Sequence, residues 1–198
     1  MLVMNINPHV RVTSDGIIEV DITPEMMASA QAKAAELGQL KNSIREGEGN
    51  LTGFLGEEAI LFAFPDAISE NTYQHDITIH GKTWEAKSKD RTVLADLSYE
   101  GSVAAYNTRQ GADEYIFCSV LREGGERNKP ETGQYTRVQI IGTCAKDRYY
   151  RIARFMKEGE VDVWTKNRFK IQADCYNVFY RKLDQPWIEE EENIARVA

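Results

Sequence analysis

Apolar positions recur along the chain with two periods, about 3.6 residues in some segments and 2 residues in others, which predicts a mixture of helices and strands. The clearest helix start is Thr23-Pro24-Glu25, a hydroxyl N-cap followed by a proline and an acid in the first turn. In chain order the predicted elements are a hairpin or edge strand over residues 9–22, helices over 25–44 and 51–64, a hairpin over 73–80 and 82–88, a helix over 97–108, strands over 115–121 and 136–143, a helix over 148–157, and short strands over 161–164 and 178–181. This order predicts an α/β fold with a central sheet flanked by helices.

The predicted hairpin of residues 73–88 carries the most informative pattern. A turn at His80-Gly81 pairs Asp76 with Glu85, whereas a turn at Gly81-Lys82 places Asp76 opposite Lys87. Side chains alternate between the two faces of a strand, so both registers give the same partition. One face carries Asp76, Glu85 and Lys87, and the other carries Ile77, Ile79, Trp84 and Ala86.

Two carboxylates on one face of a hairpin repel each other, so a positive group is expected beside them. A hard divalent cation with oxygen ligands meets that need, and Mg²⁺ is commonly bound by one or two carboxylates. A lysine two residues from the second acid is suited to orienting or deprotonating an attacking water. The alternative interpretation is an exposed hairpin whose charges face water.

The same stretch resembles the PD-(D/E)XK nuclease superfamily, which includes restriction endonucleases, Holliday-junction resolvases and many phage nucleases. Asp76 matches the first acid of its motif and Glu85-Ala86-Lys87 matches the (D/E)-x-K, while the segment 53–61 matches the preceding helix with its glutamate. The first acid follows His75 instead of a proline. The resemblance covers about residues 50–145 and implies a restriction-endonuclease-like central mixed sheet flanked by helices.

The resemblance also implies the roles of individual residues. Lys87 is expected to position or activate the water, and a glutamate of the 51–64 helix is expected to complete the site. Two adjacent glutamates compete for that place, and we choose Glu57, directly after a glycine, over Glu58. Small Gly53 is expected to allow close approach of the hairpin, and the head of Glu58 is expected to reach solvent. The cofactor implied is Mg²⁺, with Mn²⁺ as a substitute, and its ligands would be the carboxylates of Asp76 and Glu85 and the carbonyl of Ala86.

Charge is distributed unevenly along a chain whose net charge is −7. Residues 146–182 contain 10 basic and 5 acidic side chains, and a basic block on an acidic protein is typical of a polyanion site. The predicted helix over 148–157 would present a stripe of arginines to DNA, with packing of its aromatic residues into the core as the alternative. The candidate DNA-binding residues are Lys89, Arg91, Arg148, Arg151 and Arg154.

Other classes of protein lack support in the sequence. The chain has 198 residues, 42% of them hydrophobic, with no apolar run long enough for a membrane span and no recognisable signal peptide. Three widely spaced cysteines form no CxxC pair, so an intracellular, cytoplasmic location is expected. The three histidines have no zinc-site spacing, and no phosphate-binding GxxxxGK[ST] loop occurs.

We therefore predict a Mg²⁺-dependent deoxyribonuclease with one nuclease-like domain. Residues 1–49 would form an N-terminal hairpin and helix extension, 50–182 the core, and 183–198 an acidic tail. The alternatives are a non-catalytic DNA-binding or assembly protein that retains the fold, and an unrelated α/β domain whose hairpin imitates the motif. The substrate stays open between duplex, branched and single-stranded DNA, and the resemblance allows a homodimer.

Overall fold

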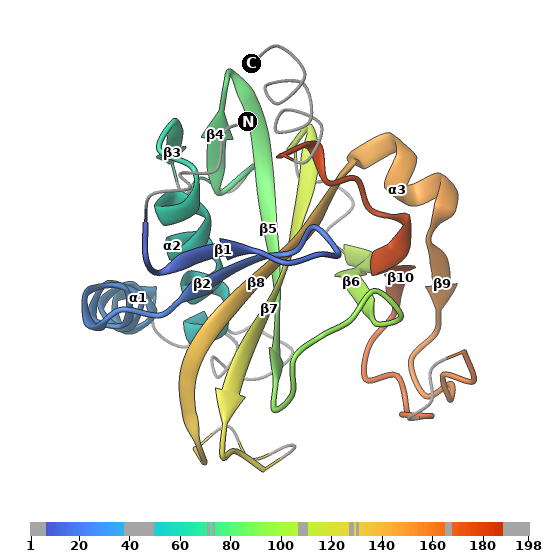
Figure 1. The fold of residues 1–198 in the computed structure, drawn as a ribbon. Coiled ribbons are helices and arrows are strands. Elements are labelled where there is room, and N and C mark those ends of the chain that lie inside the picture. Colours follow the sequence, from blue (N-terminus) through green and yellow to red (C-terminus); the bar gives the residue numbers. More distant parts are fainter. Residues whose placement is uncertain are drawn as a thin grey trace.

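The central element of the protein is a curved seven-stranded mixed sheet (Figure 1). The computed structural model describes residues 7–37, 50–70, 72, 74–106, 111–126, 129, 131–164 and 168–187. Of the neighbouring strands in this sheet, β5 and β7 run parallel and the other pairs run antiparallel. The strands, in sheet order, are β1 (Val10–Val12), β2 (Ile18–Asp21), β8 (Gln134–Ala145), β7 (Glu114–Glu123), β5 (Lys82–Arg91), β4 (Ile77–Ile79) and β3 (Ala67–Ser69).

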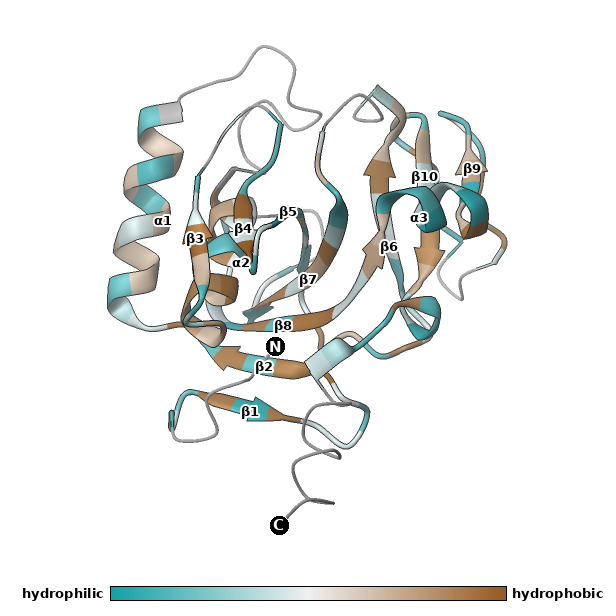
Figure 2. Cartoon of the chain, turned by 90° about the horizontal axis from the view of Figure 1, so that it is seen from above, coloured by the Kyte–Doolittle hydropathy of each residue, from teal (hydrophilic) through white to brown (hydrophobic). Residues whose placement is uncertain are grey.

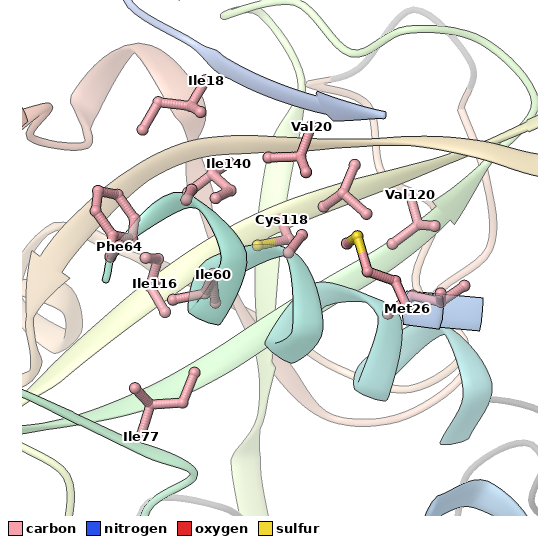
Figure 3. Close-up of a cluster of buried hydrophobic side chains, with 14 of the residues drawn as sticks. Ile18, Val20, Met26, Ile60, Phe64, Ile77, Ile116, Cys118, Val120 and Ile140 are labelled. Carbon is pink, nitrogen blue, oxygen red and sulfur yellow. The ribbon is translucent and has the colours of Figure 1, made fainter. Parts of the chain in front are cut away.

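Two helices, α1 (Pro24–Leu37) and α2 (Asn50–Ala63), lie on one face of this sheet. The helix α2 packs directly on β5, β7 and β8, and α1 packs against α2. Apolar side chains of α2 and of the inward face of the strands fill the space between them (Figure 3). This core fixes α2 over β5, the strand that carries the predicted Glu-x-Lys motif.

The opposite side of the central sheet is covered by a small three-stranded sheet and a short helix (Figure 2). The small sheet has the antiparallel order β6 (Glu100–Ala104), β10 (Cys175–Phe179) and β9 (Arg154–Met156), and the helix is α3 (Lys146–Ile152). A second core of largely aromatic residues joins these elements to β7. It includes Tyr115, Phe117, Tyr149, Val178 and Tyr180.

The helix predicted over 97–108 is wrong, because residues 100–104 form the strand β6. Its backbone pairs with β10, and Val103 is buried in the second core. Gly101 lies against the rings of Phe117 and Tyr180, where any side chain would overlap them. Residues 107–110 lie outside the described part of the chain. A non-local strand partner thus overrides the local helical pattern.

The helix predicted over 148–157 is also wrong in its second half. α3 ends at Ile152, Ala153 is extended, and Arg154 already belongs to strand β9, which pairs with β10. Because Arg154 leaves the helix, the predicted stripe of three arginines on one helical face is not formed. Of the short strands predicted further on, the segment 161–164 forms the isolated bridge Val161↔Lys170 among the described residues, and the strand predicted over 178–181 lies at Cys175–Phe179.

The other predicted elements are confirmed with small shifts of their ends. They are the hairpin β1–β2, the helices α1 and α2, the hairpin β4–β5 and the strands β7 and β8. The edge strand β3 was not predicted. Residues 38–44 of the first predicted helix lie outside the described residues, and so does the acidic tail from 188 onward. None of the described helices is long and apolar enough to cross a membrane. The fold is therefore of the mixed α/β class.

Candidate functional site

A tight turn sets the register of the β4–β5 hairpin. His80 and Gly81 both have positive φ angles, 49° and 77°, which is the requirement of a type I′ turn. Ile77 consequently pairs with Trp84 and Ile79 with Lys82, the first of the two registers considered. Ile77, Ile79 and Trp84 are buried against α2, as the partition of faces predicts.

Asp76 lies where β4 and β5 separate. Its backbone N–H donates to the Trp84 carbonyl at 3.0 Å, which is the last backbone bond toward this end of the hairpin. Its side-chain Oδ2 then accepts a hydrogen bond of 2.9 Å from the Ala86 N–H. Since the N–H and C=O of a strand residue point to the same side, the Ala86 carbonyl is directed toward this edge as well.

Glu85 and Lys87 lie on the face of β5 opposite α2. Glu85 is buried, and the Lys87 ammonium donates to its Oε1 at 2.8 Å. The same ammonium lies 5.9 Å from the centroid of the Tyr115 ring on β7. Tyr115 was not among the predicted site residues. The Tyr115 hydroxyl is hydrogen-bonded to the Tyr150 hydroxyl at 2.8 Å, which holds the Tyr115 ring in place beside Lys87.

The helix α2 brings Glu57 to the same end of the hairpin. Glu57 is buried, and its Oε2 has no hydrogen-bond partner among the described residues. Close approach of α2 to β5 depends on Gly56, because a Cβ there would overlap the hydroxyl of Ser88. Our expectation that Gly53 provides this approach is wrong, since a Cβ on Gly53 would meet no atom within 4 Å.

The neighbouring Glu58 points away from the hairpin, toward α1. Its Oε1 accepts a hydrogen bond of 2.7 Å from the Ser29 hydroxyl and lies 2.8 Å from the Lys33 ammonium. We expected its head to reach solvent, and it is instead paired with α1. Glu58 is therefore engaged by α1, whereas the charges of Asp76 and Glu85 act on the carboxyl of Glu57.

Burial and mutual repulsion raise the pKa values of two of these carboxyls. The pKa of Glu57 is raised to about 8, chiefly by burial and then by the nearby charges of Asp76 and Glu85. The pKa of Asp76 is raised to about 6, again by burial first and by Glu85 second, with a hydrogen bond from Ala86 and the charge of Lys87 opposing the rise. Perturbed carboxyls of this kind gather at functional sites.

The donor set at this place suits a hard cation. Buried carboxylates are costly unless paired with a positive charge, and the bare oxygen of Glu57 is such a group. A divalent ion such as Mg²⁺ prefers carboxylate and carbonyl oxygens, and both are present here. The described residues nevertheless contain no group of three or more acidic, histidine or cysteine side chains already close enough to hold a metal. Instead, one oxygen of Glu85 accepts a hydrogen bond from Lys87, and one oxygen of Asp76 accepts a hydrogen bond from the Ala86 N–H.

Most of the predicted DNA-binding residues make contacts within the protein. Arg91 donates to the Glu100 carbonyl at 3.1 Å, Arg148 forms an ion pair with Asp184, and Arg154 forms one with the buried Glu100. Arg151 is exposed on α3.

Lys89 lies on β5 beside the small sheet and is largely withdrawn from water. Its pKa is lowered to about 8, by burial first and then by the charge of Arg91, while Cys175, Glu100 and Asp162 oppose that change. The run of charges after the Glu-x-Lys motif gave no signal of this burial, because the small sheet that covers Lys89 comes from distant parts of the chain.

No protein-family model matches this chain, and a search of curated proteins found no significant match.

Proposed function

We propose that this protein is a divalent-metal-dependent deoxyribonuclease that hydrolyses DNA phosphodiester bonds, with a restriction-endonuclease-like fold. The observation that carries the proposal is the gathering of Glu57, Asp76 and Glu85 at one end of the hairpin, where the charges of Asp76 and Glu85 help to raise the pKa of Glu57 and the charge of Glu85 helps to raise the pKa of Asp76. Three carboxyls gathered beside one lysine are costly to ionise together unless a further positive charge compensates them, which a bound divalent cation would do.

The topology around the site gives further support. The helix α2 precedes the hairpin, and β5 pairs with the parallel strand β7 inside a mixed sheet, which agrees with the preceding helix and the central mixed sheet that the resemblance implies. One departure is the strand β6, which stands in place of the helix predicted over 97–108. The proposal thus rests on the site and only secondarily on the topology.

Each side chain has a definite task in the proposed reaction. Asp76, Glu85 and the Ala86 carbonyl would hold Mg²⁺ or Mn²⁺, which supplies stabilisation of the charge that develops on the phosphate and on the leaving oxygen. Lys87 orients the attacking water and lowers the cost of removing its proton. Glu57 completes the negative cluster from α2, and Tyr115 limits the positions open to the Lys87 ammonium.

The test is cleavage of end-labelled DNA by the wild-type protein and by Asp76→Asn. Duplex, branched and single-stranded substrates of matched sequence are incubated with Mg²⁺, Mn²⁺, Ca²⁺ or EDTA. Asp66→Asn is the matched control, because Asp66 is an exposed acid before β3 whose removal leaves the site intact. We expect metal-dependent cleavage that falls by at least about 100-fold in Asp76→Asn and is unchanged in Asp66→Asn.

Two results would overturn the proposal. Wild-type rates in a correctly folded Asp76→Asn variant would remove the site from the chemistry. Binding of DNA in Ca²⁺ without cleavage in Mg²⁺ or Mn²⁺ would favour the non-catalytic DNA-binding alternative.

A further inference from the structure

In the segment Val161–Trp164, next to the small sheet, the acidic side chain is buried and the apolar side chains are exposed, which reverses the usual preference. Its acid, Asp162, is completely buried, whereas Val161, Val163 and Trp164 are 51%, 65% and 64% exposed. Acids are among the residues least often buried, and contiguous exposed apolar side chains usually mark an interaction surface. Places where a local rule is broken in this way are where functional sites are expected.

The backbone of this segment is held in place although its side chains are exposed. The Asp162 N–H donates to the Phe169 carbonyl at 2.9 Å, and the Asp162 Oδ1 accepts the Trp164 N–H at 2.9 Å. Val161 also forms a β-bridge with Lys170. The indole of Trp164 is therefore presented to solvent by a backbone that is already ordered, so binding a ligand requires little further ordering.

Trp164 is the outer member of a ladder in which aromatic rings and guanidinium groups alternate. The Arg154 guanidinium carbon lies 5.0 Å from the centroid of Trp164 and 5.1 Å from that of Phe179, and the Arg181 carbon lies 4.0 Å from Phe179. We call these four residues the aromatic ladder. The Arg154 guanidinium is held in this position by its ion pair with Glu100. All three separations are within the range of cation–π attraction.

The basic stretch of sequence that contains the aromatic ladder favours a polyanion as its ligand. The ladder lies within the basic stretch 146–182, and its own Arg181 is exposed. The other exposed cations of the stretch, among the described residues, are Arg151, Lys157, Arg168, Lys170 and Lys182. An apolar protein partner would need no such excess of positive charge, whereas a nucleic acid needs both stacking surfaces and cations.

We propose that the aromatic ladder binds a single-stranded nucleic acid, with an unpaired base stacked on the exposed face of Trp164 and phosphates next to Arg181. That the nucleic acid is DNA rests on the proposed function. Glu100 connects this surface to the catalytic strand, because its side chain binds Arg154 while its backbone carbonyl accepts from Arg91 on β5. The substrate is accordingly DNA with an unpaired segment.

Intrinsic fluorescence can report on the aromatic ladder directly, because the other two tryptophans are buried. Trp84 and Trp187 are 5% and 2% exposed, so quenching by a stacked base comes from Trp164. The experiment titrates the full-length protein in EDTA, which prevents cleavage, with oligo(dT), with the matching oligo(U), and with a blunt hairpin duplex of equal charge.

We expect oligo(dT) to quench the fluorescence and to bind at least about 10-fold more tightly than the blunt hairpin. Trp164→Ala should weaken oligo(dT) binding by about 5- to 150-fold, measured by anisotropy of a labelled oligonucleotide, since that range is the ordinary effect of one lost stacking partner. Trp164→Phe should retain most of the affinity. Ile68→Ala, which removes an equally exposed apolar side chain from β3, should bind as the wild type does.

The inference is overturned if oligo(dT) binds without quenching, if Trp164→Ala or Arg181→Glu leaves its affinity unchanged, or if the blunt hairpin binds equally well. Tighter binding of oligo(U) than of oligo(dT) would assign the surface to RNA and overturn the choice of DNA. Failure of the proposed function gives a different pattern, namely Trp164-dependent binding of oligo(dT) with no cleavage of any DNA in Mg²⁺. Conversely, DNA cleavage in Mg²⁺ at the wild-type rate in Trp164→Ala, together with unchanged oligo(dT) binding, would leave the proposed function standing and overturn the inference about the aromatic ladder.

Discussion

Replacing Glu57 by glutamine should make the metal-free protein more stable. The carboxyl of Glu57 is buried beside two other acids, and its Oε2 lacks a hydrogen-bond partner among the described residues. Glutamine has nearly the same shape and never ionises, so it removes the repulsion while filling the same space. A substitution that stabilises the fold at the expense of activity is typical of a functional site.

The size of the effect follows from the pKa of Glu57. That pKa is about 8 in the folded chain against an ordinary value of 4.5, so the folded state binds more protons than the unfolded state between these two values. Stability therefore falls as the pH rises through this window. The cost is about 1 kcal/mol at pH 5 and about 3 kcal/mol at pH 7. The stabilisation by Glu57→Gln should grow correspondingly with pH.

Urea denaturation of the metal-free protein at pH 5, 6, 7 and 8 measures this directly. Glu58→Gln is the matched control, because it removes an ion pair with Lys33 and should change stability by no more than about 1 kcal/mol, in the destabilising direction. Addition of Mg²⁺ should stabilise the wild type more than Glu57→Gln, since a ligand that binds only the folded state adds its binding free energy to stability. A Glu57→Gln protein less stable than wild type at pH 8 would refute the reasoning.

Three further substitutions test other parts of the structure. Gly56→Ala should cost about 1–3 kcal/mol in urea denaturation, because its methyl group meets Ser88, and Ser88→Gly in the same protein should restore part of the loss. Arg122→Ala should cost about 3–5 kcal/mol, because Asp90 is left buried without its partner at 3.1 Å. Lys89→Met should stabilise the protein at pH 7. Because the pKa of Lys89 is depressed, the folded state binds fewer protons than the unfolded state between pH 8 and 10.5, so wild-type stability should rise across this window and the variant should lose that rise. An unchanged pH profile would contradict the burial of Lys89.

The sequence predicted the hairpin and its two faces because the determinants are local. The alternation of Ile77, Ile79 and Trp84 with polar residues sets the buried face, and a His80-Gly81 turn is compatible with the positive φ angles observed. The helix α2 was predicted for the same reason. The choice of Glu57 over Glu58 came from a resemblance and stays a prediction; Glu58 is paired with Lys33 of α1, whereas the charges of Asp76 and Glu85 raise the pKa of Glu57.

The small sheet could not be predicted because its stability comes from pairing across the chain. β6 lies inside the segment predicted as a helix over 97–108, and its pairing with β10 makes it a strand. Arg154 shows the same effect, since its partner Glu100 and the strand β10 draw it out of the predicted helix. The aromatic ladder and the burial of Lys89 depend on this sheet, so neither had a signal in the local pattern.

The most direct test of the central claim compares DNA cleavage by Glu57→Gln and Glu58→Gln under saturating Mg²⁺. The two glutamates are adjacent, but Glu58 is hydrogen-bonded to Ser29 of α1, whereas the charges of Asp76 and Glu85 act on Glu57. We predict that the single-turnover rate falls by at least about 100-fold in Glu57→Gln and stays within about threefold of wild type in Glu58→Gln. Loss of cleavage in Glu58→Gln with retention in Glu57→Gln, or wild-type rates in both variants, would contradict the proposed site.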